Sequence, residues 1–143
     1  TTLPMVEDVE VTGHIELILY ASSSALDTDF TAKLVDVCEQ NDCAIGLTDG
    51  IIRAKYRDST SIASCLNPGE IYKFKIDLGA TSNLFKKGHR IRLEVSSSNF
   101  PRFEANTNNG TTSAFSWEKE KAEQRIFHNN EFQSRLIIPC IPR

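Results

Sequence analysis

The sequence predicts an all-β domain, a β-sandwich of the jelly-roll type. Short runs alternate between apolar and polar residues, and residues that favour turns separate these runs. No long segment has apolar residues at the i, i+3, i+4 and i+7 spacing of an amphipathic helix. With 143 residues, 40% of them hydrophobic, the chain can bury one core. We therefore expect a single domain over residues 1–143.

Eight or nine strands are expected. The cleanest is EIYKFKIDL, in which apolar side chains alternate with polar ones, as in an antiparallel sheet with one wet face. Strands in this number without intervening helices favour a sandwich or barrel, and a jelly roll fits best. The expected strands cover residues 6–13, 14–23, 29–39, 43–50, 51–58, 70–78, 89–97, 123–129 and 134–142.

Turn signals set the expected ends of these strands. Gly13 closes the first strand, LTDG (47–50) is typical of a hairpin turn, and FKKGH (85–89) is a polar turn. Residues 116–124 carry charge nearly all round and predict a single helical turn at most. The stretch between the strands at 89–97 and 123–129 is a long loop, and such loops are usually functional or disordered. Its Asn, Gly and Thr content is typical of turns and mobility.

Composition excludes several classes of partner. The net charge is -3 with both signs mixed along the chain, so neither a nucleic acid nor a membrane surface is an expected partner. No run approaches the roughly 18 apolar residues of a transmembrane helix, and no signal peptide is recognisable. We therefore expect a cytoplasmic protein. The chain begins without an initiator methionine, and we expect residue 1 to be a cut end.

The four cysteines predict no metal site. Cys38 and Cys43 flank the turn EQND and would face each other across a hairpin, where the geometry permits a disulfide. No second close pair follows, so a zinc ribbon is not expected. Because nothing else indicates secretion, we expect reduced thiols. Cys140 lies in a terminal apolar run and is expected in the core.

No motif for nucleophilic catalysis is recognisable. The G-x-S-x-G turn of α/β-hydrolases is absent, and the serine runs lie at strand ends. Asp27 and Asp29 are spaced as paired carboxylates that bind Ca²⁺ or act as acid and base, but a calcium loop collects more oxygens. We favour a turn that leads into a strand. We expect no catalytic residue, metal or cofactor in this chain.

The segment NFPRF (99–103) leaves the strand at 89–97 with two aromatic side chains and an arginine. In one interpretation, Phe100 and Phe103 cap the open end of the core. In the other, they form an apolar surface with Arg102 as its polar anchor, a combination that interfaces use. The residues alone do not decide between these two interpretations.

Four stretches of the chain closely resemble the C-terminal non-catalytic domain of the X-Pro dipeptidyl-peptidase family, also called the CocE/NonD family. The similarity runs from about Val6 to Pro142, and FKKGHRIRLEVSSSNFPRF is its most specific part. The stretches are LDTDFTAKLVDV, GLTDGIIRAKYRDS, NPGEIYKFKIDLGATSNLFKKGHRIRLEVSSSNFPRFEANTN and IFHNNEFQSRLIIPCIP.

The resemblance implies a jelly-roll sandwich, similar to galactose-binding domains, that packs against an α/β-hydrolase catalytic domain with a Ser-Asp-His triad. It also implies that the first strand or strands of the jelly roll precede Thr1. Without those strands one edge of a sheet is open, and the chain would self-associate through that edge. In the parent enzyme the active site would lie where the domains meet. The segment NFPRF (99–103) and the loop that follows it up to Asn109 would then face the catalytic domain. The implied contact residues are Asn99, Phe100, Arg102, Phe103 and Asn106.

The resemblance thus implies an accessory role in a hydrolase of acyl esters, amides or X-Pro peptides. The domain would shape the substrate cleft and stabilise the catalytic domain without activity of its own. Where relatives continue with Asp-Arg, this chain has Glu104 and Ala105, so a salt bridge from that arginine is not expected. The alternative is a free-standing carbohydrate- or ligand-binding module that uses Tyr20, Phe115 and Trp117.

Overall fold

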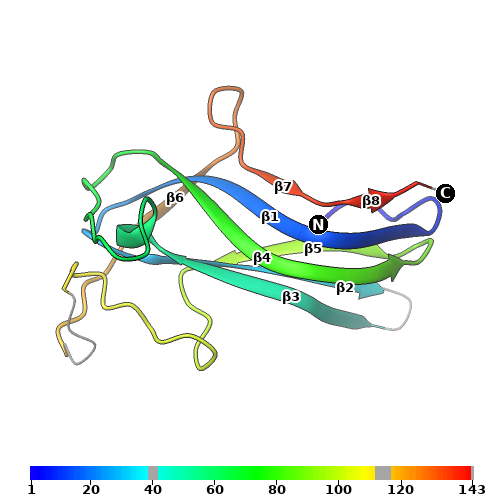
Figure 1. The fold of residues 1–143 in the computed structure, drawn as a ribbon, viewed down its shortest axis with the longest axis horizontal. Coiled ribbons are helices and arrows are strands. Elements are labelled where there is room, and N and C mark those ends of the chain that lie inside the picture. The colour runs from blue at the N-terminus through cyan, green and yellow to red at the C-terminus, as the bar shows by residue number, and fades with distance from the viewer. Residues whose placement is uncertain (39–41, 112–116, 143) are drawn as a thin grey trace.

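Two antiparallel sheets pack face to face in the computed structural model, which describes residues 1–38, 42–111 and 117–142 (Figure 1). In chain order the elements are β1 (Val9–Ser23), β2 (Asp29–Cys38), β3 (Cys43–Arg53), the 3-10 turn η2 (Ala54–Tyr56), β4 (Tyr72–Phe85), β5 (Arg90–Ser96), β6 (Gln124–Phe127), β7 (Arg135–Ile137) and β8 (Cys140–Ile141). The described residues form no α-helix. The all-β prediction is confirmed, and the jelly-roll and galactose-binding-like assignments stay predictions.

The five-stranded sheet is organised around β1. β4 pairs with one side of β1, and β8, β7 and β6 follow one another along its other side. Leu17 in β1 therefore lies opposite both Ile76 in β4 and Leu136 in β7. The predicted break at Gly13 is wrong, because this glycine continues β1 with a φ of 135° and the predicted strands 6–13 and 14–23 are one strand.

The three-stranded sheet has the order β3-β2-β5. Leu34 in β2 lies opposite Thr48 in β3 and Leu93 in β5. The strand β2 is buried on both faces for most of its length.

Apolar side chains from both sheets meet in one core. Phe30 and Phe74 lie with ring centroids 4.9 Å apart across the two layers. In β4 the alternation is as predicted, since Phe74, Ile76 and Leu78 are buried and the charged residues between them are exposed. The largest side chains of the core are Phe30, Phe74, Phe85, Ile15, Leu17, Leu19, Leu34, Ile76 and Leu78.

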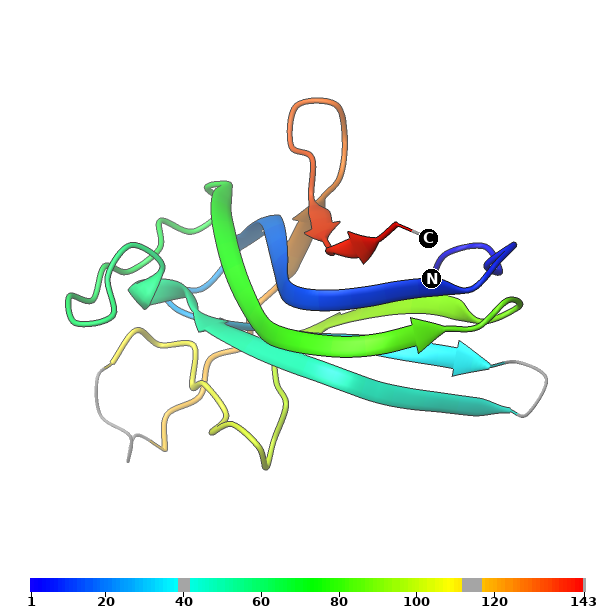
Figure 2. The ribbon, with the colours of Figure 1, turned by 45° about the vertical axis from the view of Figure 1, so that its right-hand side comes forward.

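One flank of the sandwich is closed by β3 and β4, which run side by side (Figure 2). The hydroxyl of Thr48 donates a hydrogen bond to the carbonyl of Leu78. A Cβ at Gly50 would overlap the carbonyl oxygen of Asp77, so only glycine fits at this approach. The predicted hairpin turn at 47–50 is therefore wrong: these residues lie inside β3, and Gly50 serves the contact between sheets.

On the other flank, β5 is an edge strand that the N-terminal segment partly covers. The amide of Thr2 donates to the carbonyl of Ile91 at 2.9 Å, and the amide of Met5 donates to that of His89 at 2.8 Å. Further along the strand, Val95 is 37% exposed. Self-association through this edge stays a prediction.

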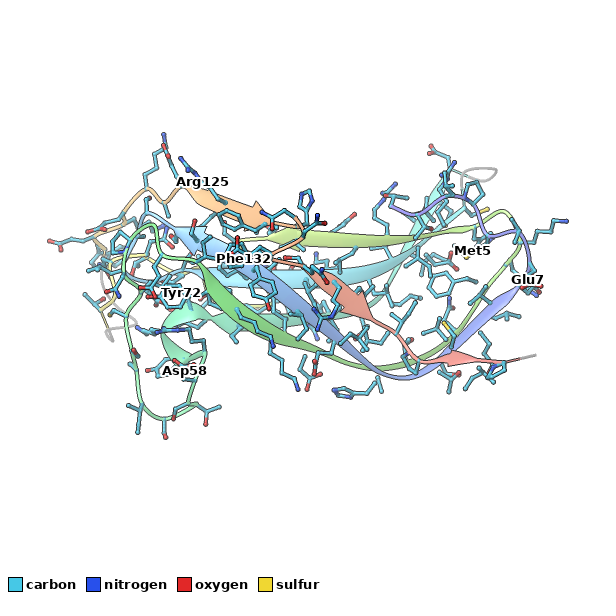
Figure 3. All side chains as sticks on the ribbon, turned by 90° about the horizontal axis from the view of Figure 1, so that it is seen from above. Met5, Glu7, Asp58, Tyr72, Arg125 and Phe132 are labelled. Carbon is cyan, nitrogen blue, oxygen red and sulfur yellow. The ribbon has the colours of Figure 1, made fainter. Side chains whose placement is uncertain are left out.

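The sandwich has two distinct ends. Figure 3 shows Asp58 and Tyr72 at one end, which we call the loop end, and Met5 and Glu7 at the other, which we call the hairpin end. The C-terminal end of β2, the N-terminal end of β3 and the β4–β5 turn lie at the hairpin end (Figure 1). The turn predicted at 85–89 is confirmed there by a hydrogen bond from the amide of His89 to the carbonyl of Lys86.

Two smaller predictions change in the structure. Residues 117–123 form no helical turn and Trp117 is 92% exposed, because its charged neighbours supply no apolar face to pack; residue 116 lies outside the described residues. Cys140 is exposed rather than in the core, since β8 is a two-residue strand at the edge of β1. No described helix is long and apolar enough to cross a membrane.

Candidate functional site

The chain folds back over the outer face of the three-stranded sheet after β5. We call residues 97–111 the return loop; it lies below the three-stranded sheet at the loop end in Figure 1. All five residues that the resemblance singled out belong to it. Because side chains of β2 and β3 alternate between the core and the outer face, the polar outer residues of both strands are available to hold the loop.

Asp49 in β3 is the first anchor of the return loop. It lies opposite Lys33 in β2, and these two side chains share the outer face. Its Oδ2 accepts a hydrogen bond from Nδ2 of Asn99 at 2.9 Å and lies 2.9 Å from Nε of Arg102. One carboxylate thus holds both ends of the turn that contains Phe100.

The two phenylalanines of the turn point to different surroundings. The amide of Phe103 donates to the carbonyl of Asn99 at 3.1 Å, which closes the turn. Phe103 is half-buried, and the guanidinium of Arg102 lies 5.5 Å from its ring centroid. Phe100 is 73% exposed. The prediction that both rings cap the core therefore fails for Phe100, whereas an apolar surface beside Arg102 agrees with the geometry.

Asn106 is held at a second anchor, formed by two buried aspartates. Its Nδ2 donates to Oδ2 of Asp27 at 3.0 Å and to Oδ1 of Asp29 at 2.7 Å. Both aspartates are 1% exposed. Asn106 is therefore a side chain that fixes the loop, and its contact with a partner stays a prediction.

Each buried aspartate also has a cationic partner. Arg53 donates from Nε and Nη2 to the two carboxylate oxygens of Asp29, at 2.9 and 3.1 Å. This hydrogen-bonded pairing raises the pKa of Arg53. Nζ of Lys55 lies 3.5 Å from Oδ2 of Asp27 and donates to the carbonyl of Thr111 at 2.6 Å, so the lysine ties the far end of the return loop to the same cluster.

Asparagine side chains stiffen the last part of the return loop. Oδ1 of Asn106 accepts from the amide of Asn108 at 2.9 Å, and Asn108 adopts a φ of 65°. Nδ2 of Asn108 reaches the carbonyl of Glu120, and Nδ2 of Asn109 reaches that of Glu118. The turns predicted from the Asn, Gly and Thr content are therefore present here, and the mobility stays a prediction.

A hollow lies on each side of the Asn99–Phe103 turn. One, of about 410 Å³, is lined by Lys33, Gly46, Leu47, Thr48, Asp49 and Arg102. The other, of about 300 Å³, is lined by Ile51, Arg53, Tyr56, Phe103 and Glu104. Both are open at the surface, so the turn stands as a ridge between two depressions.

The chemistry of this arrangement is that of a contact surface. Asp27 and Asp29 are neither a calcium loop nor an acid–base pair facing solvent, because basic and amide groups of the same domain occupy their oxygens. Asp29 begins β2 after a bend at residues 24–26, so the segment leads into a strand as we favoured. The described residues include no group of three or more His, Cys, Asp or Glu side chains placed to hold a metal ion.

Among the described histidines, two pair with carboxylates away from the return loop. Nε2 of His14 lies 2.8 Å from Asp77, and Nδ1 of His89 lies 2.9 Å from Asp36. In the part of the chain that the structure describes, no hydrogen bond joins either ring to a serine or cysteine. Neither pair is thus assembled as a base for a nucleophile.

The loop residues were predicted, but their partners were not. Asp49 was assigned to a turn, and Arg53 and Lys55 lie in the expected strand 51–58, for which no partner was predicted. The sequence does contain a weak signal of these partners. An acidic residue directly before or within an apolar strand is costly to bury without a cationic partner, so such a residue indicates that a partner exists. The pairing itself depends on how β2, β3 and the return loop meet in space.

Comparison with known proteins gives a consistent family assignment. Residues 1–137 match the model of the X-Pro dipeptidyl-peptidase C-terminal non-catalytic domain. The chain is similar to cocaine esterase from Rhodococcus sp. (strain MB1 Bresler), with 46% identity over 145 residues. That similarity covers 100% of this chain and 25% of the esterase, so the chain spans about a quarter of that relative's length.

Solved structures agree with this assignment. An aminopeptidase from a marine-sediment Thaumarchaeota archaeon superposes with a TM-score of 0.92 and 30% identity, covering 99% of this chain and 25% of that chain. An α-amino acid ester hydrolase superposes with a TM-score of 0.90 and 28% identity, covering 96% of this chain and 24% of that chain. The described fold is therefore one that occurs as about a quarter of larger hydrolases.

Proposed function

The chain belongs to the family of X-Pro dipeptidyl-peptidase C-terminal non-catalytic domains, and from this membership we propose that it serves a larger CocE/NonD-type serine hydrolase as its accessory domain. Its partner would be the α/β-hydrolase catalytic domain of the same enzyme. The domain would stabilise that partner and contribute a wall of the substrate cleft. The parent would hydrolyse acyl esters, amides or X-Pro peptides.

The observation that carries this proposal is the anchored turn at Asn99–Phe103. Asp49 holds Asn99 and Arg102, while Phe100 between them is 73% exposed. An exposed aromatic ring on a turn already fixed by hydrogen bonds loses little conformational freedom on binding. Aromatic and arginine anchors of this kind dominate the energetics of protein interfaces. We therefore assign Phe100 as the main docking side chain.

The chemistry of the turn indicates what the partner surface presents. Phe100 requires an apolar pocket, and the depressions on both sides of the turn offer space for side chains of the partner. Arg102 is 64% exposed although it is paired with Asp49, so the partner has access to the remaining donors of its guanidinium. A carboxylate or backbone carbonyl beside the apolar pocket would satisfy them.

We expect no esterase activity from this chain alone. In the described part of the chain, no serine or cysteine is hydrogen-bonded to a histidine, and the return loop presents contact groups rather than a nucleophile. The direct assay follows the hydrolysis of a p-nitrophenyl ester by the purified chain. Turnover that disappears when one of its serines is replaced would contradict the accessory role.

The docking role is tested in the full-length enzyme by Phe100→Ala. Truncation of a buried interface anchor costs about 2 kcal/mol or more, so we expect weaker domain docking, seen as a lower midpoint of thermal unfolding. Ile62→Ala is the matched control, because Ile62 is 72% exposed and lies in a different loop. Equal, small effects of both substitutions would mean that Phe100 contacts nothing in the parent.

A second candidate function is carbohydrate binding, and one observation favours it. On the outer face of the five-stranded sheet, the ring of Phe132 lies 5.7 Å from that of Tyr20 and 5.8 Å from that of Phe127. A cluster of aromatic rings beside polar groups offers an apolar surface against which the face of a sugar can pack. Trp117 lies elsewhere on the chain, and Phe115 is outside the described residues. Titration of the domain against a glycan panel separates the two candidates, since the accessory role predicts no binding.

A further inference from the structure

We propose that Cys38 and Cys43 form a reversible redox site, a dithiol at the hairpin end that closes to an intramolecular disulfide. The two residues end β2 and begin β3, and they are direct partners in the register of that strand pair. Their spacing predicted that a hairpin would bring them together, and reduced thiols were expected. The structure contains both as free cysteines.

The register supplies the geometry for a disulfide. Residues directly opposite each other in an antiparallel pair have their side chains on the same face, with Cβ atoms about 4.5–5.5 Å apart. A disulfide needs Cβ atoms about 3.5–4.5 Å apart, so closing this pair needs a shift of about 1 Å. The strands end at this position, so hydrogen bonds between the two strands hold the pair on one side only.

Exposure allows the chemistry to occur at this pair. Both thiols are half-buried, so a small oxidant can approach, whereas a fully buried thiol would be inert. The other two cysteines, Cys65 and Cys140, are exposed and lie on elements that do not pair with this hairpin. They serve as internal references for thiols without a facing partner.

The reaction is a two-step exchange with a low-molecular-weight disulfide such as oxidised glutathione. One cysteine thiolate attacks a sulfur of the oxidant, forms a mixed disulfide and releases one glutathione thiolate. The second cysteine thiolate attacks the cysteine sulfur of the mixed disulfide and releases the second glutathione. Overall, the protein loses two protons and two electrons, and the oxidant is reduced to two thiols.

The consequence is confined to the hairpin end. The return loop and its anchors Asp27, Asp29 and Asp49 lie away from the hairpin end. The disulfide would therefore leave the Asn99–Phe103 turn in place. Its effect would be to hold the ends of β2 and β3 together and to stabilise the folded domain. This inference is independent of the proposed docking role, and either can fail while the other stands.

The experiment equilibrates the folded domain in glutathione buffers of increasing oxidation, blocks free thiols with N-ethylmaleimide and digests the protein with trypsin. Cleavage after Lys33 and Arg53 leaves both cysteines in one peptide, residues 34–53. We expect this peptide to escape alkylation as an internal disulfide, while Cys65 and Cys140 are alkylated or carry glutathione. Cys38→Ser and Cys43→Ser should each convert the remaining thiol to the behaviour of Cys65.

A second measurement keeps the result independent of whether the serine variants fold. The wild-type chain is equilibrated in the same buffers in concentrated urea, where the register is lost. We expect the internal disulfide to be favoured at least about tenfold more in the folded domain than in the unfolded chain. Equal closure in both states, or separate glutathione adducts on Cys38 and Cys43 in the folded domain, would overturn the proposal.

Discussion

Asn106 provides the sharpest test of how the return loop is held. Its amide group donates to two carboxylates that are almost fully buried, at 3.0 and 2.7 Å, and accepts from the amide of Asn108. Replacement by leucine keeps the approximate size of the side chain and removes all three interactions. The buried carboxylates of Asp27 and Asp29 retain Lys55 and Arg53 but lose a donor each.

The magnitude follows from the number and type of the lost bonds. Hydrogen bonds to charged groups contribute about 1.5–3 kcal/mol each, and Asn106 is half-buried, so the lower value applies. Two such bonds give a loss of about 3 kcal/mol in the free energy of unfolding. With a urea dependence of about 2 kcal/mol per molar for a domain of this size, the midpoint of urea unfolding should fall by about 1.5 M.

Limited proteolysis gives a local measurement of the same loss. Trypsin can cleave after Arg102 only when the return loop opens, and the rate follows the population of the open form. If the hydrogen bonds of Asn106 to the two aspartates contribute about 3 kcal/mol to keeping the loop closed, their loss should make cleavage faster by about a hundredfold. Asn130→Leu is the matched control, because Asn130 is exposed and lies outside the return loop. If Asn106→Leu behaves like this control in both assays, the two aspartates do not hold the loop.

Two further predictions concern the flank and the loop end. Gly50→Ala should destabilise the domain by about 3 kcal/mol, because its methyl group overlaps the carbonyl of Asp77 at the β3–β4 contact. Gly46→Ala in the same strand has open space and should have little effect; denaturant unfolding that ranks the two equally would refute this account of the flank. Hydrogen bonds from Asn67 and then Tyr72 lower the pKa of Glu70, so its ionised form is favoured in the folded state. The stability that it contributes is present above the pKa of the unfolded chain and is lost as pH falls through the lowered pKa. Glu70→Gln should therefore be less stable than the wild type at neutral pH, and the difference in urea midpoint should shrink as pH falls through the lowered pKa of Glu70; a difference that stays constant in acid would contradict the hydrogen-bonded arrangement.

The sequence predicted the strand interiors because alternation is a local property. Phe74, Ile76 and Leu78 alternate with charged residues, and they enter the core as expected. The strand ends were less predictable because glycine marks both turns and bends. Gly79 has a φ of 75° inside β4, beside a register shift of β1, so the strand bends and continues where the sequence indicated an end.

The candidate site was predicted in part. A family resemblance pointed to Asn99, Phe100 and Arg102, and the structure brings Asn99 and Arg102 together on Asp49. Asn106, which the resemblance placed among the contact residues, is half-buried and hydrogen-bonded to Asp27 and Asp29. Its role depends on the buried carboxylate of Asp29, which lies 77 positions away in the chain. Such long-range pairing has no local sequence signal, so spacing and composition could not reveal it.

The measurement that tests the docking role most directly is hydrogen exchange on the isolated domain and on the full-length enzyme that contains it. The account predicts that the backbone amides of residues 97–106 exchange more slowly in the full-length enzyme, while those of β7 on the opposite sheet are unchanged. Equal exchange of residues 97–106 in both proteins, with new protection in β7 instead, would place the partner on the other face and contradict the assignment of Phe100.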